Sequence, residues 1–122
     1  GHEAAPEIVA QAKAIAEKTG VSIVESTELS AANGADVIYA DTWLSMGDET
    51  PLEVIKEKFM PYQVNEALME ATGASYVMHC QPAHRDLEIT GSLIDSDKSL
   101  LMQQAENRMH GQNAILTQLL NA

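Results

Sequence analysis

The chain has 122 residues, of which 45% are hydrophobic, and a formal net charge of −11 at pH 7. This length fits one domain, and the apolar fraction suffices for a buried core. The acidic balance argues against nucleic acid and anionic membrane as partners, because both favour basic surfaces, and no run reaches the roughly 18–20 apolar residues of a membrane helix.

The cysteine content and the first residues indicate the cellular compartment. The chain contains a single cysteine, which excludes an internal disulfide and fits a reducing environment. Its first residues, GHEAAPEIVA, lack the basic and apolar blocks of a signal or transit peptide. We therefore expect a cytoplasmic protein.

The apolar residues alternate between helix-like and strand-like spacing along the chain. Pro6 suits the first position of a helix, and Gly20 suits its end. Asn65 is a good N-cap for a later helix. The predicted elements are, in order, a helix over residues 6–20, a strand over 21–24, a helical turn from Thr27 to Gly34, a strand over 36–40, a helix over 50–59 that starts with a capping box, a helix over 65–73, strands over 75–79 and 99–102, and a helix over about 104–120.

Strands that alternate with helices predict an α/β fold with a parallel sheet covered on both faces. Ligands bind such sheets beyond the carboxyl ends of the strands. Two polar loops follow predicted strands there, DTWLSMGDETP at residues 41–51 and HCQPAHRDLEIT at residues 79–90. We refer to them as the Asp41 loop and the Cys80 loop, and we expect them to face each other across one cleft.

The Cys80 loop allows four interpretations from its residues alone. Cys80 could be a nucleophile with His79 or His84 as its base. The three side chains could also contribute to a zinc site, although the usual paired ligand spacings are missing. Alternatively, the thiol could hydrogen-bond a substrate, or it could be a small buried residue at a strand end.

The Asp41 loop and the start of the last helix each allow two interpretations. Asp41 could hold a substrate ammonium group while Gly47 lets the backbone approach the ligand, or the loop could be solvated, with Trp43 packed on the core. Arg108, in the triplet ENR, could add to the attraction of a helix N-terminus for anions. It could equally belong to a surface network of residues spaced four apart.

Four sequence blocks in a fixed order carry a family resemblance. They are DTWLSMG from Asp41, FMPYQVN from Phe59, HCQPAHR from His79 and QAENRMHGQNAIL from Gln104. Together they resemble the carboxyl-terminal half of the ornithine carbamoyltransferases over nearly the whole chain. The resemblance implies a Rossmann-like, three-layer sheet with helices on both faces and a long C-terminal helix. Residues 1–122 would form one ornithine-binding domain, whose final helix, from about residue 104, packs on an absent carbamoyl phosphate domain.

The resemblance also implies the function and the roles of individual residues. The family transfers the carbamoyl group of carbamoyl phosphate to the δ-amine of ornithine, which gives citrulline and phosphate, without a metal or another cofactor. Asp41 would hold the δ-ammonium group, and Cys80 would contact the reaction centre as a catalytic residue without forming a covalent adduct. The implied ligands are Asp41, Ser45 and Met46 for ornithine, and Cys80, Gln81 and Arg108 for carbamoyl phosphate.

Two departures from the family pattern limit what the resemblance implies. Gln81 stands where the family usually has leucine in HCLP. The family's phosphate-binding motif S-T-R-T-R and its H-P-x-Q motif do not occur in this sequence. We therefore expect the chain to be inactive alone and to work with an N-terminal carbamoyl phosphate domain, in a homotrimer or a larger assembly.

Two alternatives to ornithine carbamoyltransferase stay open at this point. One is a related carbamoyltransferase with another acceptor, such as putrescine, although the SMG segment of the Asp41 loop favours ornithine. The other is a substrate-binding fragment without catalysis.

Overall fold

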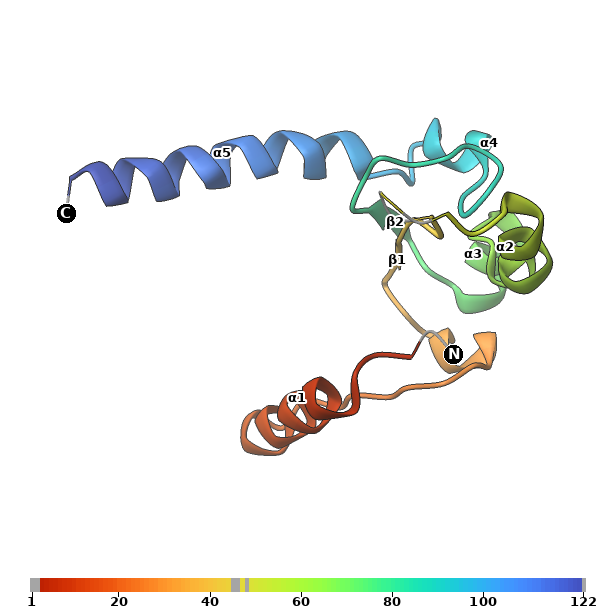
Figure 1. Cartoon of the computed structure of the whole chain (residues 1–122), viewed down its shortest axis with the longest axis horizontal. Coiled ribbons are helices and arrows are strands. Elements are labelled where there is room, and N and C mark those ends of the chain that lie inside the picture. Colours follow the sequence, from red (N-terminus) through yellow and green to blue (C-terminus); the bar gives the residue numbers. More distant parts are fainter. Residues whose placement is uncertain (1–2, 45–46, 48, 122) are drawn as a thin grey trace. The chain divides into compact units, whose positions relative to one another are not determined.

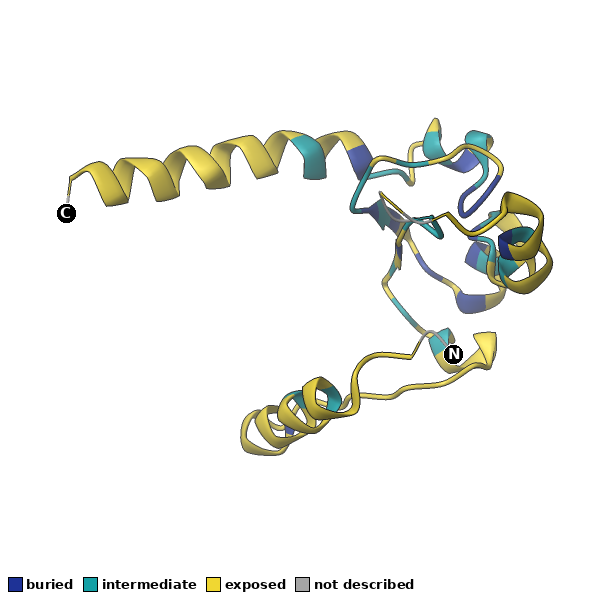
Figure 2. Cartoon of the chain, in the orientation of Figure 1, coloured by how far each residue is buried: buried dark blue, intermediate teal, exposed yellow. Residues whose placement is uncertain are grey.

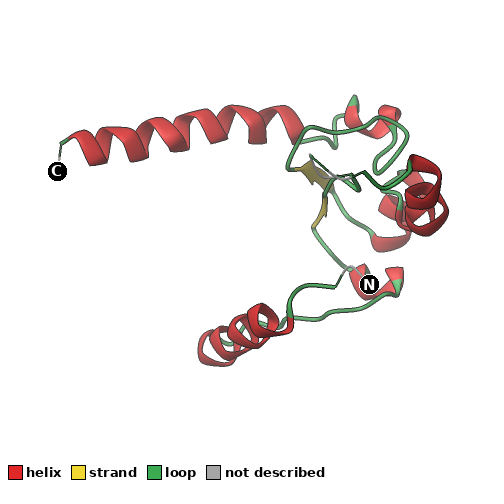
Figure 3. Ribbon diagram, viewed as in Figure 1, coloured by secondary structure: helices red, strands yellow, loops and turns green. Residues whose placement is uncertain are grey.

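The computed structural model describes residues 3–44, 47 and 49–121. It divides into two compact units, Gly1–Ala31 and Ala32–Ala122. Figure 3 shows that helices and loops dominate both units and that the strands are short.

The first unit consists mainly of helix α1, Pro6–Thr19, followed by a chain segment without regular structure. Proline occupies the start of α1, and Gly20 ends it with a left-handed φ of 74°, as predicted. An ion pair of 3.1 Å joins Lys13 Nζ to Glu25 Oε2 across this unit. Most of its side chains are exposed, and Ala16 is the buried residue of α1.

The second unit contains the parallel sheet and the remaining helices (Figure 1). A 3-10 turn at Leu29–Ala32 leads into it. Its elements are β1 (Val37–Ala40), α2 (Leu52–Phe59), the 3-10 turn Met60–Tyr62, α3 (Glu66–Thr72), β2 (Tyr76–His79), α4 (Gly91–Ile94) and α5 (Leu101–Leu120).

Strands β1 and β2 pair in parallel, in a register that matches Ala40 with His79. On its other side β2 meets residues 98–100, because Val77 N–H donates to the Lys98 carbonyl and Leu100 N–H donates to the Val77 carbonyl, both at 2.9 Å. Strand β2 is thus bonded on both edges, and Val77 is fully buried. The predicted parallel α/β arrangement with a C-terminal helix is confirmed.

Two of the predicted strands were wrong. Residues 21–24 form no strand among the described residues, and Val21 and Val24 expose 60% and 72% of their surface. β-branched residues favour a strand only where a neighbouring strand takes up their hydrogen bonds. Residues 99–102 meet β2 by a single bridge at Ser99, because the apolar run that follows starts α5 and buries Leu101.

The helix boundaries agree with the sequence pattern to within a few residues. Asn65 caps α3 by accepting a hydrogen bond of 3.0 Å from Leu68 N–H, and Gly73 ends this helix with a φ of 78°. Helix α2 begins at Leu52 with Pro51 as its N-cap, one residue later than the predicted capping box implies. Helix α5 begins at Leu101, somewhat earlier than predicted.

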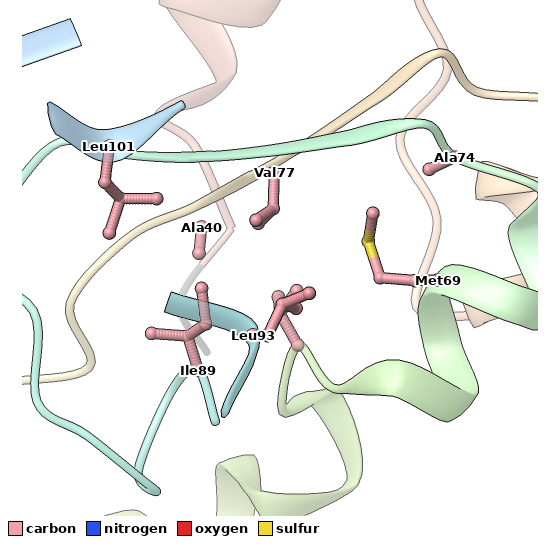
Figure 4. Packing of buried hydrophobic residues seen from close by; sticks show 8 residues of the cluster. Ala40, Met69, Ala74, Val77, Ile89, Leu93 and Leu101 are labelled. Atoms are coloured by element: carbon pink, nitrogen blue, oxygen red, sulfur yellow. The ribbon is translucent and has the colours of Figure 1, made fainter. Parts of the chain in front are cut away.

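One hydrophobic cluster holds the second unit together (Figure 4). Side chains from α3, α4, α5 and the Cys80 loop pack against the two strands, and Val77 and Ile89 are fully buried. The cluster consists of Ala40, Val64, Met69, Ala74, Val77, Ile89, Leu93 and Leu101. Because Ala40 directly precedes the Asp41 loop and Ile89 belongs to the Cys80 loop, the same packing that stabilises the fold also helps to hold both loops at the sheet.

Helix α5 differs from the rest of its unit in burial. Leu101 is its buried residue, and the side chains that follow are exposed or partly exposed along the whole helix (Figure 2). Apolar side chains are among them: Met109, Leu116 and Leu119 expose 53%, 56% and 69% of their surface. No helix in the described ranges is long and apolar enough to cross a membrane.

Candidate functional site

The Asp41 loop and the Cys80 loop meet at the carboxyl edge of the sheet, as the sequence predicted. Asp41 follows the last residue of β1 and Cys80 follows the last residue of β2, and those two last residues are paired in register. The Cys80 thiol donates to Asp41 Oδ1 over 2.8 Å. The backbone N–H of Thr42 donates to the same oxygen at 2.7 Å. The sheet register therefore brings the thiol and the carboxylate into direct contact.

This contact sets the protonation of both groups. Burial raises the pKa of the Cys80 thiol above its ordinary 9.0, and the hydrogen bond to Asp41 raises it further. The same bond, with that from Thr42 N–H, lowers the pKa of Asp41 below its ordinary 3.8. At neutral pH the pair is thus a thiol and a carboxylate. Since a nucleophilic cysteine requires the thiolate, the arrangement disfavours that interpretation of Cys80.

His79 is buried, and both of its ring nitrogens are engaged. Gln81 N–H donates to His79 Nδ1 at 2.7 Å, so Nδ1 is the acceptor and the ring hydrogen lies on Nε2. His79 Nε2 then donates to Glu88 Oε1 at 3.1 Å. A ring bonded in this way has no free nitrogen for zinc, and the described residues contain no group of three or more His, Cys, Asp or Glu side chains that could hold a metal ion.

Glu88 is the residue of this network that the sequence analysis missed. Its Oε1 also accepts from His84 N–H at 2.6 Å and lies 3.5 Å from His84 Nδ1. The carboxylate is buried, and Oε2 has no hydrogen-bond partner in the described part of the chain. A lone carboxylate between the apolar residues Leu87 and Ile89 was the signal that could have pointed to it.

Among the described residues of the Asp41 loop, Trp43 and Thr42 make further contacts that anchor it. Trp43 stacks on Phe59 of α2 with ring centroids 5.7 Å apart. The Thr42 hydroxyl donates to the Leu44 carbonyl at 3.1 Å and lies 3.4 Å from His84 Nδ1. Gly47 has a φ of 89°, a conformation that glycine adopts readily. Ser45 and Met46 lie outside the described residues, so their predicted role has no structural counterpart here.

The residues predicted to bind carbamoyl phosphate, Cys80, Gln81 and Arg108, line one hollow beside the sheet edge. Its volume is about 820 Å³. Arg108 is exposed on α5, and Glu106, two residues before it, makes an exposed contact of 3.5 Å with His110, one turn further along the helix. The residues that line the hollow include Tyr39, Cys80, Gln81, Gln104, Asn107 and Arg108.

Comparison with known proteins identifies the family of this chain. Residues 1–119 match the family model described as aspartate/ornithine carbamoyltransferase, Asp/Orn binding domain. The chain is 57% identical over 114 residues to the ornithine carbamoyltransferase of Vibrio sp. (strain 2693), an alignment that covers 93% of this chain and 38% of that protein. It therefore spans less than half the length of this curated relative.

Solved structures agree with this match. An ornithine carbamoyltransferase from Pyrococcus furiosus superposes with a TM-score of 0.83 at 40% identity, over 93% of this chain and 37% of that one. A mutant N-acetyl-L-ornithine transcarbamylase complexed with PALAO gives a TM-score of 0.79 at 28% identity, over 94% and 36% of the two chains. The family predicted from the four sequence blocks is thus confirmed, and the chain belongs to the aspartate/ornithine carbamoyltransferases, where it matches the Asp/Orn binding domain.

Proposed function

We propose that this chain is the ornithine-binding domain of an ornithine carbamoyltransferase. The observation that carries the proposal is the contact of the Cys80 thiol with the Asp41 carboxylate, beside a hollow that Arg108 also lines. The contact supplies an anion for an ammonium group, and the hollow has a cation for the phosphate of carbamoyl phosphate. Among relatives, the ornithine carbamoyltransferase of Vibrio sp. is 57% identical to the chain.

Asp41 would bind the δ-ammonium group of ornithine. One of its oxygens accepts from the Cys80 thiol and from Thr42 N–H, and the carboxylate remains exposed to solvent. Its second oxygen can therefore accept from a substrate amine. Ser45 and Met46 would bind the amino-acid head group, as the family resemblance implies.

The δ-amine must lose a proton before it attacks the carbamoyl carbon. The Cys80 thiol can accept this proton only if its own proton moves to Asp41, because the thiol is the protonated partner of the pair. The neutral amine then adds to the carbonyl carbon, and the tetrahedral centre collapses as the bond to the phosphate oxygen breaks. The departing phosphate takes the proton that the attacking nitrogen still has to lose. The products are citrulline and phosphate.

Gln81 and Arg108 would bind carbamoyl phosphate. Gln81 has a φ of 57°, and its N–H donates to buried His79, so the turn that carries its backbone is held from within the fold. Arg108 would stabilise the charge that develops on the phosphate oxygens as the bond breaks. Most of the rate acceleration would come from positioning and electrostatics.

The complete enzyme would need a second, carbamoyl phosphate-binding domain. The chain covers only 38% of its Vibrio relative, and α5 exposes apolar side chains such as Met109, Leu116 and Leu119. We propose that this face of α5 packs on that second domain, and that the assembled protein is a homotrimer or larger. Large exposed apolar surfaces commonly mark such interfaces.

An exchange of domains tests this function. The 122-residue chain would replace the matching segment of the Vibrio relative, and citrulline would be measured with saturating carbamoyl phosphate. We expect turnover with ornithine that exceeds turnover with putrescine or N-acetylornithine, and background rates for the chain alone. Preference for either other amine would refute the ornithine assignment. A folded but silent hybrid that still binds ornithine would instead indicate a binding fragment.

A further inference from the structure

Gln104 occupies the place where α5 leaves the sheet. Leu101 is the buried residue of this helix, and beyond Gln104 and Ala105 the described side chains of α5 are exposed. The direction of the helix against the sheet therefore depends on few contacts near its start (Figure 1). Gln104 is half-buried, and its side-chain amide makes two of these contacts, both hydrogen bonds.

The amide of Gln104 bonds both strands of the sheet. His79 N–H donates to Gln104 Oε1 at 3.2 Å, and Gln104 Nε2 donates to the Tyr39 hydroxyl oxygen at 2.6 Å. A backbone N–H can only donate, so the oxygen of the amide must face His79. This leaves the NH₂ group facing Tyr39, so the two bonds together fix the orientation of the amide.

Each partner of Gln104 lies next to a residue of the proposed site. His79 directly precedes Cys80, and Tyr39 lies two residues before Asp41. Arg108 follows Gln104 by four residues in the same helix, so the two side chains share one helix face, and both line the hollow. One side chain thus connects the strand ends that carry the thiol and the carboxylate to the helix that carries the guanidinium group.

We propose that Gln104 is a positioning residue that sets Arg108 against Cys80 and Asp41. This inference rests on the proposed function, and Gln104 itself need not touch either substrate. Without its amide, α5 would keep its helical structure and the Leu101 anchor, but the helix could turn or shift at its start. A displacement of about 1 Å between catalytic groups can cost up to about a hundredfold in rate.

Three variants and one matched control test the proposal in the hybrid enzyme described above. Gln104→Met keeps the length of the side chain but removes both bonds. Gln104→Glu can keep both, because a carboxylate accepts from His79 N–H and from a rotated Tyr39 hydroxyl. Tyr39→Phe removes one bond only. The control is Gln103→Met, at the exposed neighbouring position in the same helix.

The expected result separates a positioning role from a purely structural one. For Gln104→Met, kcat/KM for carbamoyl phosphate should fall by about ten- to a hundredfold. Gln104→Glu should recover part of that loss, and Gln103→Met should change nothing. Tyr39→Phe should have a smaller effect, which disappears in the Gln104→Met background because the shared bond is already gone. Unchanged kinetics in Gln104→Met would overturn the inference while the function stands.

A second measurement on the 122-residue chain does not depend on activity. In Gln104→Met the His79 amide should exchange with solvent faster, and residual dipolar couplings should show a changed direction of α5 against the strands. If the hybrid proves inactive with ornithine, the proposed function fails. The direction of α5 in the isolated chain then decides whether Gln104 orients this helix against the strands. An unchanged helix direction would overturn the inference in that case.

Discussion

The two loops that form the site differ in how the fold holds them. The Cys80 loop buries several of its side chains, among them His79, Glu88 and Ile89, and Val64 N–H donates to the Glu88 carbonyl at 2.8 Å. No described residue of the Asp41 loop is buried. The contacts that its described residues make with the other loop include the thiol bond to Asp41 and the approach of the Thr42 hydroxyl to His84.

This difference assigns different tasks to the two loops. The Cys80 loop is built into the core, so it can present the thiol and the adjacent backbone in one geometry before any substrate arrives. The Asp41 loop presents its carboxylate to solvent, as a group that captures an ammonium ion must. Changes inside the Cys80 loop should therefore affect stability first, and changes in the Asp41 loop should affect binding first.

The largest effect should follow Glu88→Ala. This change leaves the His79 Nε2–H and the His84 N–H without their shared acceptor, and the former is fully buried. An orphaned buried donor costs about 1–3 kcal/mol, and the His84 N–H, which is only partly buried, should cost somewhat less, so we expect the free energy of unfolding to fall by about 2–5 kcal/mol. Urea denaturation of the 122-residue chain measures this.

Glu88→Gln is the matched control, because the amide oxygen can still accept from both donors. It should lose less stability than Glu88→Ala. If the two variants were equally stable, the buried hydrogen bonds would contribute little, and the contrast between a built-in loop and an exposed loop would not hold.

Asp41→Asn should have the next largest effect, on substrate binding. It keeps the shape of the side chain and removes the charge that would hold the δ-ammonium group. Loss of such a charge-assisted bond costs on the order of 1.5–3 kcal/mol, which is about ten- to a hundredfold in kcat/KM for ornithine. Steady-state kinetics of the hybrid enzyme measure this effect. Unchanged ornithine kinetics would make Asp41 an ordinary turn residue.

Cys80→Ser should cause a partial loss of turnover, about tenfold or less, because serine keeps a donor and an acceptor in nearly the same place. Loss of a covalent nucleophile would instead remove several orders of magnitude. Mass spectrometry during turnover should show no carbamoyl adduct on Cys80. A trapped adduct would revive the nucleophile interpretation.

The pH dependence of stability gives an independent check on Cys80. Burial and then the Asp41 hydrogen bond raise the pKa of the folded thiol above its ordinary 9.0. A raised pKa stabilises the fold fully below the unfolded value, and this contribution is lost as the pH rises through the folded value. The wild-type chain should therefore lose stability on the alkaline side, in a range where Cys80→Ser does not. Parallel alkaline titrations of both proteins measure this difference.

The sequence predicted the meeting of the two loops but not what supports them. Parallel strands end at one sheet edge, which is a general property of the α/β fold, so the proximity of Asp41 and Cys80 followed from strand order alone. Asn65 was also predictable, because a helix cap is a local feature. The supporting contacts of Glu88 and Gln104 were not predicted, because their partners depend on tertiary packing.

The wrong strands have a related explanation. Val21 and Val24 have the composition of a strand, but composition does not say whether a neighbouring strand is present. The apolar run after Ser99 fits either a strand or the first turn of a helix, and periodicity alone does not separate these for short segments. Both errors therefore lie where a short apolar segment depends on its surroundings.

Thr42→Val should have the smallest effect, and it tests the weaker link between the loops. Valine keeps the backbone N–H that donates to Asp41 but removes the hydroxyl that lies 3.4 Å from His84 Nδ1 and donates to the Leu44 carbonyl. A typical hydrogen bond contributes about 0.5–1.5 kcal/mol, so KM for ornithine should rise a few-fold at most, with kcat nearly unchanged. Thr117→Val is the control, because its hydroxyl donates to the Asn113 carbonyl within α5, away from the two loops. A loss as large as that of Asp41→Asn would show that the Asp41 loop is held as firmly as the Cys80 loop, since a single hydroxyl would then control the position of the carboxylate.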